Sequence, residues 1–164
     1  MRKGKPRVVV DTSVLVAGAS GFRLNRGRGR SNPNAELVRR WISFDSFEWL
    51  YSEDILSEYK HILKKKGARP STIGKIVNLF REEGIVVLVT RSYEISPDYS
   101  DNPFCDCAIV GQADYIVTNN LRDFPQEKLS AKIVSPNLLQ PEILNNLAFD
   151  RTIELFWGPY CKRR

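Results

Sequence analysis

Short apolar runs alternate along the chain with amphipathic stretches that have the period of a helix. The apolar runs predict strands at 7–11, 47–51, 85–89, 115–117 and 133–134. The amphipathic stretches predict helices that begin at Pro33 and Pro103 and others that span about 53–66, 70–83 and 136–147. Strands that alternate with helices are typical of parallel sheets covered by helices. The pattern therefore predicts an α/β fold, a three-layer α/β/α sandwich around a central, mostly parallel sheet of four to five strands.

Individual residues predict where several elements begin and end. Ser52 and Asn102 are expected to cap the helices that follow them, and Gly84 is expected to end the helix at 70–83. The run at 85–89 has no polar position, which is typical of a strand in the interior of a sheet. Residues 18–33 alternate glycine and arginine and predict a flexible cationic loop.

The composition limits the class of protein. A chain of 164 residues is expected to form one domain, 1–164, with flexible basic tails at 1–6 and 158–164. Its formal net charge of +6 favours an anionic partner, nucleic acid first and an acidic membrane surface second. Three cysteines do not make a disulfide framework, so a reducing cytoplasm is the expected location. A single histidine argues against a zinc site, and no apolar run is long enough to span a bilayer.

Three carboxylates occur where an isolated charge would be costly. Asp11 follows the apolar strand at 7–11, so it is expected either to serve chemistry at that edge of the sheet or to cap the turn there. Asp106 is the only polar side chain from 104 to 111, and it needs a metal ion or hydrogen-bond donors inside the protein. Capping of the helix start is the alternative for Asp106. Glu58 lies at the border of the apolar face of its helix, where it could reach a cleft or pair with a nearby lysine or histidine.

The last polar group follows the strand at 115–117. Asn120 and Asp123 lie just past its carboxyl end, where they either join Asp11 or form a turn. Converging carboxylates without a histidine or cysteine base suit Mg²⁺ or Mn²⁺. The edge of the sheet is therefore expected to hold a divalent ion.

Four motifs in order resemble those of the PIN-domain nuclease family. They are Val-Val-Asp11-Thr-Ser-Val-Leu, Ile55-Leu-Ser-Glu58-Tyr, Asp101-Asn-Pro-Phe-Cys-Asp106-Cys-Ala-Ile and Ala113-Asp-Tyr-Ile-Val-Thr118-Asn-Asn120-Leu-Arg-Asp123-Phe. The resemblance implies a Mg²⁺- or Mn²⁺-dependent ribonuclease, often the toxin of a toxin–antitoxin pair. It implies an acidic set of Asp11, Glu58, Asp106 and Asp123, with Asp101 as the extra acid of one branch and with Ser13, Thr118 and Asn120 in support. Two positions depart from the family pattern: Ser13 stands where the family usually has asparagine, and Asn120 where some branches have an acid.

The sequence thus predicts a phosphodiesterase that acts on single-stranded RNA. Asp11 and Asp106 are expected to hold the principal metal, and Glu58 and Asp123 a second ion or the attacking water. Phosphates are expected to contact the basic residues Arg23, Arg26, Arg28, Arg30, Lys64, Lys65 and Lys66. A small antitoxin protein and a second copy of the chain are the expected protein partners, with no membrane partner.

Two other functions are compatible with these residues. A binding module for RNA or protein on the same scaffold, with weak or no catalysis, would suit Ser13 and Asn120. A phosphotransferase of the haloacid dehalogenase type would use an aspartate after the strand as nucleophile. That family has a second aspartate two residues later, where this chain has Ser13.

Overall fold

The computed structural model describes residues 4–24 and 32–143, apart from the side chains of 20–24, 44 and 140–143. Its centre is a sheet of five parallel strands in the order β3-β2-β1-β4-β5. The strands are β1 (Arg7–Val10), β2 (Glu48–Tyr51), β3 (Ile85–Val86), β4 (Tyr115–Val117) and β5 (Lys132–Val134). The prediction of an α/β fold with a parallel sheet is confirmed.

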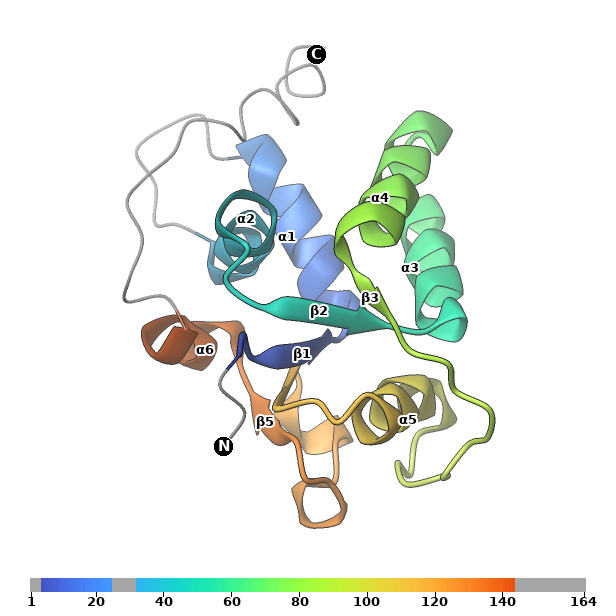
Figure 1. Cartoon of the computed structure of the whole chain (residues 1–164). Helices are drawn as coiled ribbons and strands as arrows, with labels where there is room; N and C mark the ends of the chain where they lie inside the picture. The colour runs from blue at the N-terminus through green and yellow to red at the C-terminus, as the bar shows by residue number, and fades with distance from the viewer. Residues whose placement is uncertain (1–3, 25–31, 144–164) are drawn as a thin grey trace.

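Helices cover both faces of this sheet. The chain moves outward from β1 to β2 and β3 and then returns to pair β4 with β1. Because crossovers between parallel strands are right-handed, this reversal places the helices before and after it on opposite faces. The first group is α1 (Thr12–Leu24), α2 (Pro33–Phe44), α3 (Glu53–Lys65) and α4 (Pro70–Glu83). Figure 1 shows this group together above β2, with α5 (Asn102–Val110) on the other side. The last helix described, α6 (Pro136–Ile143), packs against α2.

The core lies on both faces of the central strands. Val8, Val9 and Val10 have no exposed surface, as expected for a strand buried between two helix layers. Under α2, α3 and α4, the rings of Trp41, Trp49 and Phe80 lie with centroids 4.7 to 5.1 Å apart. Contacts at these distances add to the stabilisation from burial. The apolar stripes predicted on α2, α3 and α4 therefore face the sheet.

Most of the predicted helix starts are confirmed. The side chain of Asn32 accepts a hydrogen bond from the N–H of Asn34, and Ser52 accepts one from the N–H of Ile55. Asn102 is an exception, because it is the first residue of α5 and not its cap. Its side chain instead accepts a hydrogen bond from the backbone N–H of Ser96, 2.9 Å away. Asn102 thus holds the loop that precedes α5.

The flexible loop predicted at 18–33 is wrong in its first part. Helix α1 continues through residue 24, while 25–31 lie outside the described residues. The packing around Gly18 explains why this position in α1 is a glycine. A Cβ atom at this position would lie 2.8 Å from the backbone oxygen of Asn34 and 3.0 Å from Val38. Close packing of α1 on α2 therefore outweighs the low helix propensity of glycine.

The interior strand predicted at 85–89 is also wrong. Strand β3 has two residues and lies at the edge of the sheet, where Val86 is 58% exposed and Leu88 81% exposed. Only Val87 of this run is buried. An apolar run alone does not distinguish an edge strand from a central one, because strand order depends on pairing with distant residues. The helix predicted at 136–147 is described only as far as Ile143. Among the described residues, the helices are too short or too polar to cross a bilayer.

Candidate functional site

The strand order has one point where the direction of the crossovers changes, between β1 and β4. Ligands in open α/β sheets bind at such a point, outside the carboxyl ends of the strands. Asp11 follows β1, and its N–H donates to the backbone oxygen of Val117, 2.8 Å away. Thr118 follows β4, so these two polar residues stand side by side at this edge.

Asp11 is oriented by two hydroxyl groups. The Oγ of Ser13 and the Oγ1 of Thr118 donate to the same atom, Oδ2 of Asp11, at 2.7 and 2.9 Å. The first turn of α1 is closed by the backbone oxygen of Asp11, which accepts from the N–H of Val14. Ser13 therefore helps to hold the carboxylate of Asp11 in one orientation.

Glu58 of α3 points to the same edge. The hydroxyl of Thr12, at the start of α1, donates to Oε1 of Glu58 at 2.7 Å. Partial burial raises the pKa of Glu58, the Thr12 bond opposes this, and the charge of Asp11 adds to it. The Thr12 bond joins Glu58 to the residue that follows Asp11, so the two carboxylates belong to the same edge of the sheet.

Asp101 is the acid with the most unfavourable surroundings. It ends the short turn η1 (Tyr99–Asp101), is buried, and makes no capping bond to α5. Its buried Oδ2 has no hydrogen-bond partner among the described residues. Burial raises the pKa of Asp101 to about 7, and the negative charges of other carboxylates add to this effect: Asp11, Asp98, Asp123 and Glu58.

Asp123 completes the group from the turn η2 (Leu121–Asp123) after β4. The side-chain N–H of Asn120 donates to the carboxylate of Asp123, and the N–H of Asn120 donates to Thr118 Oγ1 at 3.0 Å. The hydroxyl of Ser96 donates to the backbone oxygen of Asp123 at 3.1 Å. Asn120 and Thr118 therefore link Asp123 to Asp11 through hydrogen bonds.

The structure gives Asp106 a partner of its own. Its Oδ1 accepts a hydrogen bond from the backbone N–H of Tyr93, 2.9 Å away, and the residue is 4% exposed. Asp106 thus has one hydrogen-bond donor inside the protein, from a backbone group, and its predicted role as a metal ligand stays a prediction. Its charge acts on Cys105 and Cys107, whose buried thiols have a pKa of about 12, raised mainly by burial. Both cysteines lie in the core, as the sequence indicates.

Sequence reasoning missed one member of the group, Asp98. Its Oδ1 accepts hydrogen bonds from both the N–H and the hydroxyl of Ser100, and these bonds lower its pKa. An aspartate two residues before a serine is a turn signal, which could have placed Asp98 in a turn near Asp101, but the sequence does not show that its charge acts on Glu58.

Only some of the residues predicted to contact phosphate lie in the described part of the structure. Lys64 and Lys65 form the last turn of α3, Lys66 follows them, and all three are exposed. Lys64 is six positions after Glu58, which corresponds to about 9 Å along a helix. Arg23 lies in α1, but its side chain is not among the described ones. Arg26, Arg28 and Arg30 lie outside the described residues.

The side chains of these acids are not arranged as a set of metal ligands in the described part of the chain. Within residues 4–24 and 32–143, no group of three or more histidine, cysteine, aspartate or glutamate side chains is arranged to hold a metal ion. We therefore define the site by the hydrogen bonds that connect the acids and by the effect of their charges on one another's pKa values.

A protein-family model described as a PIN domain matches residues 7–122 of the chain. The chain belongs to the PIN-domain family. The fold is therefore of the nuclease type, since PIN domains are generally metal-dependent nucleases. The matched segment of this PIN domain contains Asp11, Glu58, Asp101 and Asp106 and ends one residue before Asp123. A search of curated proteins returned no match.

Proposed function

We propose that this PIN domain is a metal-dependent endoribonuclease that hydrolyses single-stranded RNA at the edge formed by β1 and β4. The observation that carries the proposal is Asp101, a buried carboxylate whose Oδ2 has no hydrogen-bond partner in the described part of the chain and whose pKa is raised by burial and by the charges of four other acids. Such an arrangement is unfavourable unless the carboxylate is protonated or neutralised by a cation.

The residues present fit a divalent ion. Carboxylate oxygens are the ligands that Mg²⁺ and Mn²⁺ prefer. Asp11, Glu58, Asp101 and Asp123 would hold the metal. When bound, the ion would acidify a water molecule and neutralise charge on a phosphodiester. The ligand role predicted for Asp106 stays a prediction, and its bond to Tyr93 leads us to place Asp101 ahead of it.

The neutral polar residues position the acids. Ser13 and Thr118 fix Oδ2 of Asp11, Thr12 fixes Glu58, and Asn120 fixes Asp123. Side chains whose orientation is set by hydrogen bonds are held ready for a substrate, which lowers the cost of ordering the site. These four residues therefore act as positioning residues.

A polyanionic substrate suits the charge of the chain. The net charge of +6 and the exposed lysines after Glu58, Lys64 to Lys66, would attract a phosphate backbone to an acidic site. A single strand is the form of RNA whose backbone can bend into an edge between helices. Arg23, Arg26, Arg28 and Arg30 keep their predicted role in phosphate contact.

Cleavage of an end-labelled single-stranded RNA with Mn²⁺ or Mg²⁺, with and without a chelator, tests the function. We expect chelator-sensitive internal cleavage that is lost in Asp11→Asn and kept in Asp54→Asn, an exposed acid in the first turn of α3. Unchanged cleavage by Asp11→Asn, or cleavage that a chelator leaves intact, would contradict the proposal.

A second candidate function is an RNA- or protein-binding module with weak or no catalysis. It is favoured by Asn120, which uses part of the acceptor capacity of Asp123. This module would bind RNA with the same affinity in the presence of a chelator and would not cleave it. The toxin role, an antitoxin protein and a homodimer stay predictions.

A further inference from the structure

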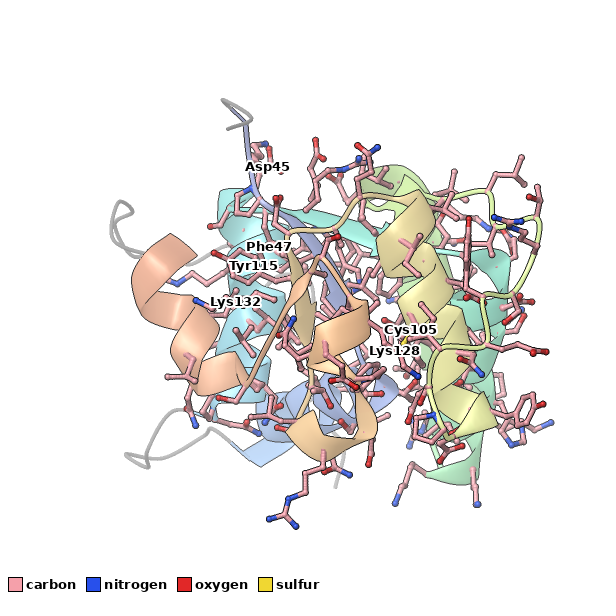
Figure 2. The ribbon with its side chains drawn as sticks, turned by 90° about the horizontal axis from the view of Figure 1, so that it is seen from below. Asp45, Phe47, Cys105, Tyr115, Lys128 and Lys132 are labelled. Atoms are coloured by element: carbon pink, nitrogen blue, oxygen red, sulfur yellow. The ribbon has the colours of Figure 1, made fainter. Side chains whose placement is uncertain are left out.

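A pocket is lined by Arg122 and Phe124, the two neighbours of Asp123 in the chain. It has a volume of about 450 Å³, within the range of about 300–1,000 Å³ that is usual for small-ligand sites. One wall is the loop from Glu94 to Pro97, and the other is the segment from Arg122 to Lys128 after β4. Figure 2 shows Lys128 on this segment, drawn in orange, and Cys105 on the yellow helix α5.

The loop wall is held in place from two directions. The N–H of Tyr93 binds Asp106 and the N–H of Ser96 binds Asn102, so α5 fixes the loop on both sides of Glu94. The hydroxyl of Ser96 binds the backbone oxygen of Asp123, which joins the loop to the acidic group. Glu94 itself adopts a left-handed backbone with φ of 49°, a conformation that is unfavourable for its residue type. A wall with this many anchors is formed before a ligand arrives, which favours binding.

The lining combines three kinds of chemistry. Ile95 and the prolines give apolar surface, on which the face of a base can rest, whereas Phe124 also lines the pocket but is only 4% exposed. Arg122 and Lys128 are exposed cations suited to phosphate. Glu94 and Glu127 are exposed carboxylates, which accept hydrogen bonds and donate none when ionised. This set of groups matches one nucleotide.

We propose that this pocket binds a nucleotide next to the scissile phosphate and favours bases with an exocyclic amino group over uracil. The proposal rests on the ribonuclease function above. Cytosine presents an amino donor where uracil presents a carbonyl oxygen, which a carboxylate repels. Glu94 and Glu127 select the base, while Arg122 and Lys128 contact its phosphates.

Cytosine and uracil provide a matched pair for the test. After the cut in a single-stranded RNA has been mapped, the base on each side is changed in turn between cytosine and uracil. We expect kcat/KM to be at least about fivefold higher with cytosine at one of the two positions. The ratio falls toward one in the double variant Glu94→Gln, Glu127→Gln, and it is kept in Glu82→Gln, Glu83→Gln, whose exposed acids end α4.

The phosphate contacts have a separate readout. In Arg122→Ala, Lys128→Ala, the dependence of log KM on log salt becomes shallower by about 0.7 for each lost contact with a single strand. Arg81→Ala, an exposed cation on α4, leaves that slope unchanged. An unchanged slope in the double variant, equal kcat/KM for both bases at both positions, or a ratio that survives Glu94→Gln, Glu127→Gln overturns the proposal.

A separate experiment tests the pocket if the proposed ribonuclease activity is absent. If the wild-type chain cleaves no RNA, fluorescence anisotropy decides the pocket by comparing oligocytidylate with oligouridylate. Tighter binding of oligocytidylate that is lost in Glu94→Gln, Glu127→Gln supports a base-selective pocket without catalysis. Equal affinities for the two oligomers overturn it.

Discussion

Two aspartates at α5 are buried to a similar degree but have different surroundings. Asp101, just before the helix, is 9% exposed, and Asp106, within it, is 4% exposed. Asp106 has a backbone N–H as partner, whereas Oδ2 of Asp101 has none among the described residues, and the charges of four other acids help to raise the pKa of Asp101. Burial of a carboxylate therefore does not identify a candidate ligand by itself. A candidate ligand is identified by the groups around the carboxylate, because they determine whether its oxygens already have hydrogen-bond partners.

The largest expected effect separates the two residues by activity. Asp101→Asn should lower kcat/KM for RNA about a thousandfold, because metal-assisted stabilisation is worth several kcal/mol. Asp106→Asn keeps an oxygen for the N–H of Tyr93 and should lower kcat/KM less than about tenfold. Cleavage assays with Mn²⁺, with circular dichroism to confirm folding, measure both. Equal losses would make Asp106 a ligand as the sequence predicts and would remove the distinction.

The next effect concerns pH in the presence of a chelator. Because the pKa of Asp101 is raised from 3.8 to about 7, the folded state binds its proton more tightly than the unfolded state does. The contribution of Asp101 to stability is therefore full below about pH 4 and is lost as pH rises through about 7. The loss is about 1.4 kcal/mol for each unit between the two pKa values.

Urea unfolding at several pH values compares the wild type with Asp101→Asn. The variant should lack this decline and should be the more stable protein at pH 8. An identical pH dependence in the two proteins would contradict the unfavourable environment assigned to Asp101. Added Mn²⁺ should stabilise the wild type more at pH 8 than at pH 5, since protons compete with the ion.

A smaller effect concerns the partner of Asp106. Asp106→Ala leaves the N–H of Tyr93 without its acceptor and should lower the free energy of unfolding by about 2 kcal/mol. Asp101→Ala, at pH 8 without metal, should not lower it. Denaturant unfolding measures both, with Asp106→Asn as the variant expected to retain most of the stability. Greater destabilisation by Asp101→Ala would reverse the comparison.

The smallest expected effect concerns Asp11, which has two hydroxyl donors. Ser13→Ala removes one of them and should lower kcat/KM about fivefold, which corresponds to about 1 kcal/mol. Ser57→Ala, an exposed serine of α3, serves as the control. If Ser13→Ala has full activity, Thr118 alone orients Asp11.

Local signals in the sequence predicted much of the fold. Asn32 and Ser52 cap their helices, and Pro33 and Pro70 lie in the first turns, because these preferences depend on neighbouring residues alone. The helical conformation around Gly18 in α1 and the edge position of β3 could not be predicted in this way. Gly18 is accepted because α2 packs closely on it, and Val86 is exposed because β3 is the last strand on its side of the sheet among the described residues.

For the candidate site, the sequence by itself determined which acids follow strands and helix starts, and from them the family and the carboxyl edge. Only the tertiary structure decided which of these acids lie together and which have a separate hydrogen-bond partner. It set Asp98 and Asp101 near Asp11 and Glu58, and it gave Asp106 to the backbone of Tyr93. The physical reason is that the charge state and hydrogen bonding of a buried carboxylate depend on groups distant in the chain, which only the folded sheet and helices bring together.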